Sequence, residues 1–274
     1  QTGRQWLLER KYDAITEQQF FFSTEAAQFM VWYQLLNAPD AVRKRFALAL
    51  SEMFVVSMDG VMMLNWQSFL VADDRDVLNR NAFGNFRTLL EEITLNPGMG
   101  IFLNTLGNQK EDTTTGRVPD ENYAREVMQL FTIGLHQLNI DGTDKLDGAG
   151  KPIETYVQSD VTNLARVFTG YFLDKQAAGS FKSPKPPNLP VENLAYLTQA
   201  MQFDASKHSN LEVNFLGINI PAGTPGPQAL KIALDGLFNH PNVGPFFGRQ
   251  MIQRLVTSNP SPAYVARVAK AFNN

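Results

Sequence analysis

Apolar residues recur at spacings of three and four along much of the chain, which is the pattern of helices with one buried face. In residues 23–36, for example, Ala26, Phe29, Met30, Tyr33 and Leu36 follow this spacing behind a Ser-Thr-Glu start. Similar stretches cover residues 39–54, 73–81, 83–94, 119–133, 159–172, 227–239, 245–257 and 261–272. The sequence therefore predicts a mainly α protein whose amphipathic helices pack against one another.

Two stretches depart from the helical pattern. Residues 138–156 contain two Gly-rich turns among short apolar positions, and residues 212–220 alternate between apolar and polar as a strand does. We therefore expect a small hairpin or an ordered loop over 138–156. In all, one or two small β-hairpins should lie among helices in a multi-helix orthogonal arrangement.

A proline-rich stretch marks an expected division of the chain. Residues 176–192 include Pro184, Pro186, Pro187 and Pro190, a composition that breaks both helix and strand. The prediction is a main helical domain over 1–175, a linker over 176–192, and a smaller lobe of a hairpin and helices over 193–274, packed on the first.

Composition excludes several classes of function. With 274 residues, of which 44% are hydrophobic, the chain can bury a large core. Its net charge of -3 means that it has no excess of basic residues to bind the phosphates of a nucleic acid. We therefore expect no nucleic-acid partner. The absence of cysteine excludes disulfides, thiol nucleophiles and thiolate metal sites. The apolar stretches are too short for a membrane-spanning helix, so no membrane span is predicted.

The densest group of polar residues is the stretch PDENYARE at 119–126. On a helix, Asn122 and Glu126 share a face, and Glu121 and Arg125 form an i,i+4 ion pair. One interpretation is a solvated face. The other is a buried network in which Glu126 is a hydrogen-bonded carboxylate, a general acid or base, or an oxygen ligand, and this requires the cluster to lie inward.

A second polar stripe consists of Asp160, Asn163 and Arg166 on the helix predicted after the hairpin. If it faces the first stripe, Glu126 and Asp160 could share an arginine or hold a hard divalent cation through carboxylate and amide oxygens. The alternative is a set of surface ion pairs and helix-dipole contacts.

Two single residues are also candidates. His208 lies in a loop that could present it to a cleft, although we favour a structural role for it. Arg254 lies one turn before Ser258 at a helix start that could bind an anion, where capping is the commoner use. The three histidines form no metal motif, and no nucleophile or nucleotide-binding signature occurs, so neither a metal nor a cofactor is predicted.

Five stretches carry motifs that can be compared with a known family. They are NAFGNFRTLLEEITLNPGMG at 81–100, PDENYAREVMQLFTIGL at 119–135, LNIDGTDKLDGAGKPI at 138–153, DVTNLARVFTGY at 160–171 and HPNVGPFFGRQMIQRLVTSNPSPAYVARVAKAF at 240–272. Together with the region of His208, they closely resemble the bacterial domain-of-unknown-function 1800 family of uncharacterised exported proteins. The resemblance covers nearly the whole chain.

The resemblance carries several implications. Family members are usually longer and generally have export signals, so the chain looks like an internal portion of a periplasmic or extracellular protein. Their genes commonly neighbour those of an exported family that resembles sulfatases, which implies a protein partner. Because the family has no established reaction, the motif at Glu121, Asn122, Arg125 and Glu126 identifies a signature and not a catalytic role.

We therefore expect a noncatalytic helical scaffold or binding module associated with a partner protein. The alternative is an enzyme with a carboxylate, amide and arginine site, with or without a hard divalent cation, acting on an anionic or carbohydrate-like substrate. Its candidate catalytic residues are Glu126, Asp160 and His208, and its candidate binding residues are Glu121, Asn122, Arg125, Asn163, Arg166 and Arg254.

Overall fold

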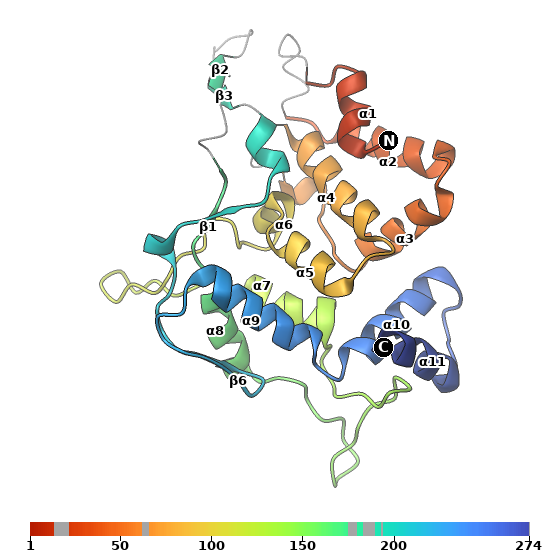
Figure 1. Cartoon of the computed structure of the whole chain (residues 1–274), viewed down its shortest axis with the longest axis vertical. Helices are drawn as coiled ribbons and strands as arrows, with labels where there is room; N and C mark the ends of the chain where they lie inside the picture. Colours follow the sequence, from red (N-terminus) through yellow and green to blue (C-terminus); the bar gives the residue numbers. More distant parts are fainter. Residues whose placement is uncertain (14–21, 62–65, 175–179, 183–189, 193, 274) are drawn as a thin grey trace. The chain divides into compact units, whose positions relative to one another are not determined.

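The computed structural model divides the chain into two compact units, each built from two segments (Figure 1). Unit 1 contains Gln1–Leu106 and Tyr171–Gln202, and unit 2 contains Gly107–Gly170 and Phe203–Asn274. The structure describes residues 1–13, 22–61, 66–174, 180–182, 190–192 and 194–273. Most of the predicted linker, 176–192, lies outside the described residues, and the domain division expected from the sequence stays a prediction.

Unit 1 is a group of helices around α4. Its helices are α1 (Gly3–Glu9), α2 (Glu25–Asn37), α3 (Ala41–Ser51), α4 (Gln67–Asn81), α5 (Phe86–Thr94) and α6 (Pro97–Phe102), with 3-10 turns at η2 (Asp59–Val61) and η5 (Leu194–Thr198). Helix α4 contacts α1, α2, α3, α5 and α6, and apolar residues such as Phe69, Leu70 and Leu78 are buried there. The core of unit 1 therefore forms around this one helix.

Polar side chains of α4 hold the starts of two neighbouring helices. Asp76 accepts hydrogen bonds from the backbone N–H of Gly3 at 2.6 Å and of Arg4 at 3.0 Å. Ser68 accepts from the N–H of Ala27 and donates to the carbonyl of Ser23. The first N–H groups of a helix have no partner inside it, so these contacts satisfy donors that α1 and α2 would otherwise bury unpaired.

Helix α2 is confirmed, but the face indicated by its apolar spacing is only partly right, because Ala26 and Met30 are buried and the other residues of that face are exposed. The structure buries Ala27 and Gln34 together with Met30. By contrast, Phe29 is 54% exposed and Leu36 is 77% exposed. Both faces of this helix are rich in apolar residues, so the spacing alone does not identify the buried one.

Two further differences from the sequence expectation concern short elements. The proline-rich stretch contains paired strands, β2 (Ser180–Lys182) and β3 (Pro190–Glu192), with Lys182 opposite Pro190. Proline is tolerated there because it is the first residue of its strand. Asn96 and Pro97 follow the helix predicted over 83–94 and begin a further short helix, α6, whose first N–H groups Asn96 caps. Strands β1 (Tyr171–Phe172) and β4 (Gln202–Phe203) form another pair.

Unit 2 combines helices, one hairpin and a long ordered loop. Its elements are α7 (Asn122–Glu126), the π-helix η3 (Val127–Thr132), α8 (Gln158–Val167), the 3-10 turn η6 (Ala205–Lys207), β5 (Val213–Phe215), β6 (Ile218–Ile220), α9 (Gly226–Phe238), α10 (Val243–Leu255) and α11 (Pro262–Phe272). The rings of Tyr123 and Phe168 meet edge to face in the core, with centroids 4.8 Å apart. The predicted fold class, mainly α with small β-hairpins, is confirmed.

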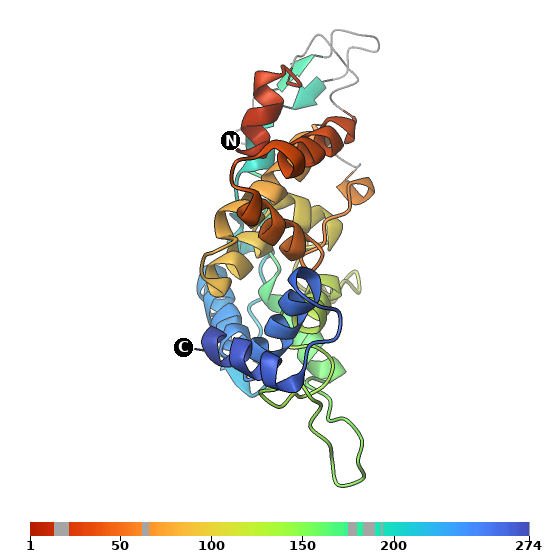
Figure 2. The ribbon, with the colours of Figure 1, turned by 90° about the vertical axis from the view of Figure 1, so that its right-hand side faces the viewer.

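The loop between η3 and α8 is held by backbone hydrogen bonds and isolated bridges, such as Leu138 opposite Asp144. Buried Asn242, just before α10, donates to the carbonyls of Ile133 and His136 and accepts from the N–H of Leu138. In both views the tip of this loop, around residues 146–152, projects away from the helices of its own unit (Figures 1 and 2). The expected small hairpin or ordered loop is thus an ordered loop anchored by one amide.

None of the helices in the described residues has both the length and the apolar character needed to cross a bilayer.

Candidate functional site

The polar signature begins in a short helix whose first residues are held by neighbouring side chains. Asn108 accepts from the N–H of Asp120 at 2.9 Å, and Asp120 accepts from the N–H of Asn122 at 2.8 Å. After Glu126 the helix continues as the π-helix η3, and the chain leaves it at Gly134 with a positive φ of 71°. A π-helix takes more residues per turn than an α-helix. Such turns are rare in proteins overall, and many of those that occur lie at functional sites.

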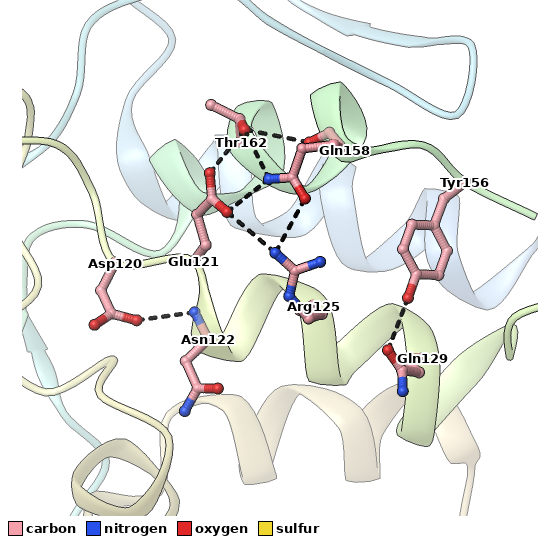
Figure 3. A network of polar contacts seen from close by, with 8 residues as sticks. All are labelled: Asp120, Glu121, Asn122, Arg125, Gln129, Tyr156, Gln158 and Thr162. Atoms are coloured by element: carbon pink, nitrogen blue, oxygen red, sulfur yellow. Dashed lines mark hydrogen bonds and ion pairs between the residues drawn. The ribbon is translucent and has the colours of Figure 1, made fainter.

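Glu121 is the centre of a network that joins the start of α7 to α8 (Figure 3). Its Oε2 accepts from Arg125 Nη2 at 3.2 Å and from Gln158 Nε2 at 2.8 Å. Its Oε1 accepts from the hydroxyl of Thr162 at 2.7 Å. Arg125 Nη2 also donates to Gln158 Oε1 at 3.1 Å. Both oxygens of this carboxylate are therefore engaged by protein donors.

The network is only partly inside the molecule. The side chain of Arg125 is 38% exposed and that of Glu121 is 32% exposed, and Gln158 and Thr162 are exposed residues. Ion pairs that water reaches contribute about 0 to 1 kcal/mol to stability. The inward position that a functional site requires is thus realised only in part.

Two other signature residues do not take part in this network. Asn122 contributes its backbone N–H, and Figure 3 shows its carboxamide directed away from Glu121. Glu126 has one oxygen, Oε2, that is closed to solvent and has no hydrogen-bond partner among the described residues. Burial raises the pKa of Glu126, and the positive charge of Arg125 opposes the rise. Of the signature acids, Glu126 alone combines an unpaired oxygen with a raised pKa within the described part of the chain.

The second stripe lies against the β5–β6 hairpin. Asp160 accepts from the N–H of Leu216 at 2.9 Å and, through its other oxygen, from the backbone N–H three residues before it at 2.8 Å. Arg166 donates to Asn163 Oδ1 at 2.5 Å and to the carbonyl of Glu212 at 3.1 Å. The stripe thus fastens the hairpin to α8, and within the described part of the chain it makes no hydrogen bond to the signature helix.

His208 is buried in a separate cluster. Its Nδ1 lies 2.9 Å from the carbonyl of Thr169, and its ring meets Phe203 edge to face at 5.2 Å. The neighbouring Ser209 hydroxyl donates to Glu111 Oε1 at 2.9 Å. Burial lowers the pKa of His208, which keeps the ring neutral near pH 7. The contacts describe an anchored loop rather than an imidazole presented to a cleft.

A hollow surface in unit 2 lies beside the π-helix, between the long loop and α10. It consists of two adjoining cavities of about 320 and 360 Å³, and Asp144, Arg249 and Gln253 line both. Gln129 and Leu130 of the π-helix line the first. We call this pair of cavities the α10 cleft.

Sequence reasoning missed most of the residues that line the α10 cleft. Phe246, Arg249, Gln250 and Gln253 follow the i, i+3, i+4, i+7 spacing of one helix face, which is a signal that could have been found. Arg254, the predicted binding residue nearby, instead donates to the backbone and side-chain oxygens of Gln250. The π-helix has no comparable signal, because the apolar spacing of 119–133 fits an ordinary helix.

The described residues hold no group of three or more histidine, aspartate or glutamate side chains placed to bind a metal ion. In the long loop, Asp141 Oδ1 accepts from the N–H and the hydroxyl of Thr143 in its own turn. Turn formation is therefore the observed role of that carboxylate.

Comparison with known proteins gives one match. The family described as "Protein of unknown function (DUF1800)" matches residues 11–274. Neither the curated proteins nor the solved structures compared with the chain give a match.

Proposed function

The chain belongs to the DUF1800 family, and from this membership we propose that it is a noncatalytic helical binding module of an exported protein. One observation carries the proposal. The carboxylates of Glu121 and Asp160, one from each polar stripe, have both oxygens engaged by protein donors that join structural elements. A carboxylate whose two oxygens both accept from donors on other structural elements joins those elements, which is the use expected in a scaffold.

The proposed partner is a protein, and the sulfatase-like exported protein of the same bacterium is the first to test. The test is calorimetric titration of that protein into the full chain, after fractionation of the source cells has placed the chain in the periplasm or medium. We expect a saturable complex of defined stoichiometry. A chain found only in the cytosol, or one that binds no macromolecule, would contradict the proposal.

A second candidate function is supported by Glu126. Its unpaired, solvent-closed Oε2 and its raised pKa are properties of a general acid or base. On this alternative the protein is an enzyme acting on an anionic or carbohydrate-like substrate, with or without a hard divalent cation.

The variants Glu126→Gln and Glu121→Gln separate the two candidates. Both variants keep the side-chain shape and remove a negative charge. Glu121→Gln is the matched control, because both oxygens of Glu121 already accept hydrogen bonds from protein donors. The binding module predicts that Glu126→Gln leaves the dissociation constant of the complex unchanged. The enzyme predicts turnover of a substrate that Glu126→Gln abolishes at unchanged melting temperature, and that result would replace the binding module.

A further inference from the structure

The long loop packs closely against α10 at one point and against α11 at another, and the α10 cleft lies between these two points. A Cβ on Gly134 would lie 2.8 Å from the Phe246 ring, and one on Gly142 would lie 2.9 Å from Val265. Both glycines also have positive φ, so a side chain at either would be strained as well as crowded. The close approaches fix the loop at both ends of the cleft and leave its middle open.

The wall of the cleft presents hydrogen-bond donors. Gln129 Oε1 already accepts from the Tyr156 hydroxyl at 3.0 Å (Figure 3), and Gln250 Oε1 already accepts from Arg254. Each glutamine is therefore left with its NH₂ group to offer.

Arg249, which lines both cavities, is the charged donor of this wall. It makes one hydrogen bond among the described residues, to the carbonyl of Gly142 at 3.4 Å, and no ion pair with any of them. Two amide donors and an unneutralised guanidinium favour a ligand with a carboxylate.

The cleft also contains apolar surface beside these donors. Leu130 and Leu135 are large apolar side chains left about half exposed at the first cavity, which Leu138 and Phe246 also line. Asp144, at the junction of the cavities, supplies an acceptor. A ligand that fits has a carboxylate, an N–H donor close to it, and an apolar group.

We propose that the α10 cleft binds the C-terminal end of a protein chain that finishes in an apolar residue. The terminal carboxylate is held by Arg249 and the glutamine N–H groups, the last peptide N–H donates to Asp144, and the last side chain packs on Leu130 and Leu135. This assignment rests on the proposed function, because it names the feature by which a binding module recognises its partner. An acidic sugar also has a carboxylate but lacks the apolar side chain, so the exposed leucines favour the peptide.

The test uses fluorescein-labelled hexapeptides and the full chain, with binding read by fluorescence anisotropy. The last residue is Leu, Ile, Val, Phe, Ser or Asp, and each peptide is made with a free carboxylate and with a terminal amide. We expect peptides with a free carboxylate and an apolar last residue to bind. Amidation, or Ser or Asp at the end, weakens binding about 10-fold or more, because a charged hydrogen bond or the apolar contact is lost.

Two arginine variants locate the site. Arg249→Gln should remove the preference for the free carboxylate, so that acid and amide peptides bind alike. Arg267→Gln is the matched control, because Arg267 is exposed on α11, contacts Tyr264 and does not line the cleft. It should leave the preference unchanged. Melting temperatures measured by circular dichroism confirm that both variants are folded.

Several outcomes would overturn the assignment. They are equal affinity for acid and amide peptides in the original chain, an unchanged preference in Arg249→Gln, or binding of trigalacturonate where no peptide binds. If the partner complex persists in Arg249→Gln while every peptide fails, the cleft inference alone is wrong. If instead no partner binds and a Glu126-dependent turnover is found, the proposed function itself falls.

Discussion

Two helical regions carry clustered charges, and the fold treats them in opposite ways. In unit 1, Asp73, Asp74 and Asp76 lie within one turn of α4, and Asp74 and Asp76 are buried. In unit 2, Glu121 just before α7 and Arg125 within it each have about a third of the side chain exposed. Sequence reasoning selected the second region and passed over the first. The comparison shows that clustered charge does not indicate burial, and that burial decides how much each charge matters.

Burial changes the acidity of the α4 carboxyls. It raises the pKa of Asp73 to about 6, with Asp76 adding to the rise and with Arg80, Arg4 and the Asn96 side chain opposing it. It raises the pKa of Asp74 to about 7, where Arg75 opposes the rise and Asp73 adds to it. The α4 charges therefore influence folding near neutral pH, whereas water screens the charges of the signature.

The largest expected effect is the response of unit 1 to pH. Asp73 and Asp74 have an ordinary pKa of 3.8 and bind protons more strongly in the folded state, so the stability that these two groups contribute is greatest below pH 4 and is lost as pH rises to about 7. Acidification from pH 8 to pH 5 should raise the free energy of unfolding of unit 1 by about 2 to 4 kcal/mol. Tryptophan fluorescence during urea unfolding measures this unit alone, because Trp6, Trp32 and Trp66 all belong to it.

The control for this response is Asp74→Asn, in which unit 1 should be more stable at pH 8 and its stability should depend less on pH.

Unit 2 should respond to pH in the opposite direction. Burial lowers the pKa of His208 and His240, so their contribution is complete above pH 6.5 and is lost as pH falls below it. Far-ultraviolet circular dichroism follows both units. If the unfolding free energies from tryptophan fluorescence and from circular dichroism change with pH in the same way, the two units do not respond to pH in opposite directions.

The next effect in size is the loss of the Asp76 cap. Asp76→Ala leaves the N–H groups of Gly3 and Arg4 without their acceptor at the buried start of α1. Unpaired buried donors cost about 1 to 3 kcal/mol, so we expect unit 1 to lose about 2 kcal/mol of unfolding free energy. Urea unfolding read by tryptophan fluorescence measures it, and Asp76→Asn, which keeps one acceptor oxygen, should lose less. Equal losses in the two variants would mean that charge and not capping is responsible.

The fold class could be predicted from the sequence because it depends on local spacing. The helices near α3, α5, α8, α9, α10 and α11 have apolar residues every three or four positions, and this spacing survives in the structure. What spacing does not give is which face is buried, as Phe29 and Leu36 of α2 show. That choice is made by helices distant in sequence.

The candidate site was predicted less well, because its partners come from separate segments. The pair Glu121 and Arg125 follows from i,i+4 spacing and is observed. Its contacts with Gln158 and Thr162 depend on the packing of α7 against α8, which the sequence does not state. The sequence leaves open whether Asp160 faces Glu126, and in the structure the oxygens of Asp160 accept from backbone N–H groups. The α10 cleft, finally, depends on a loop held by Asn242, about a hundred residues further along the chain.

A smaller effect is expected at the signature itself. Glu121→Gln keeps a side-chain oxygen for Thr162 but removes the charge that attracts Arg125. Because both side chains are partly exposed, unit 2 should lose only about 0.5 to 1 kcal/mol of unfolding free energy, far less than unit 1 loses in Asp76→Ala. Urea unfolding followed by circular dichroism measures it. A loss above about 2 kcal/mol would mean that the network behaves as a buried one.

The smallest expected effect is the change that salt makes to the loss of stability in Glu121→Gln. The Debye length falls from about 10 Å at 0.1 M salt to about 3 Å at 1 M, so salt screens an ion pair that water reaches far more than a buried charge. The measured quantity is the difference in unfolding free energy between the original chain and Glu121→Gln, by circular dichroism at 0.1 and 1 M sodium chloride. This difference should shrink by a few tenths of a kcal/mol at the higher salt concentration, while acidification should still stabilise unit 1. A difference that salt leaves unchanged would show that Glu121 and Arg125 are shielded from solvent, and the two regions would then differ in chemistry but not in burial.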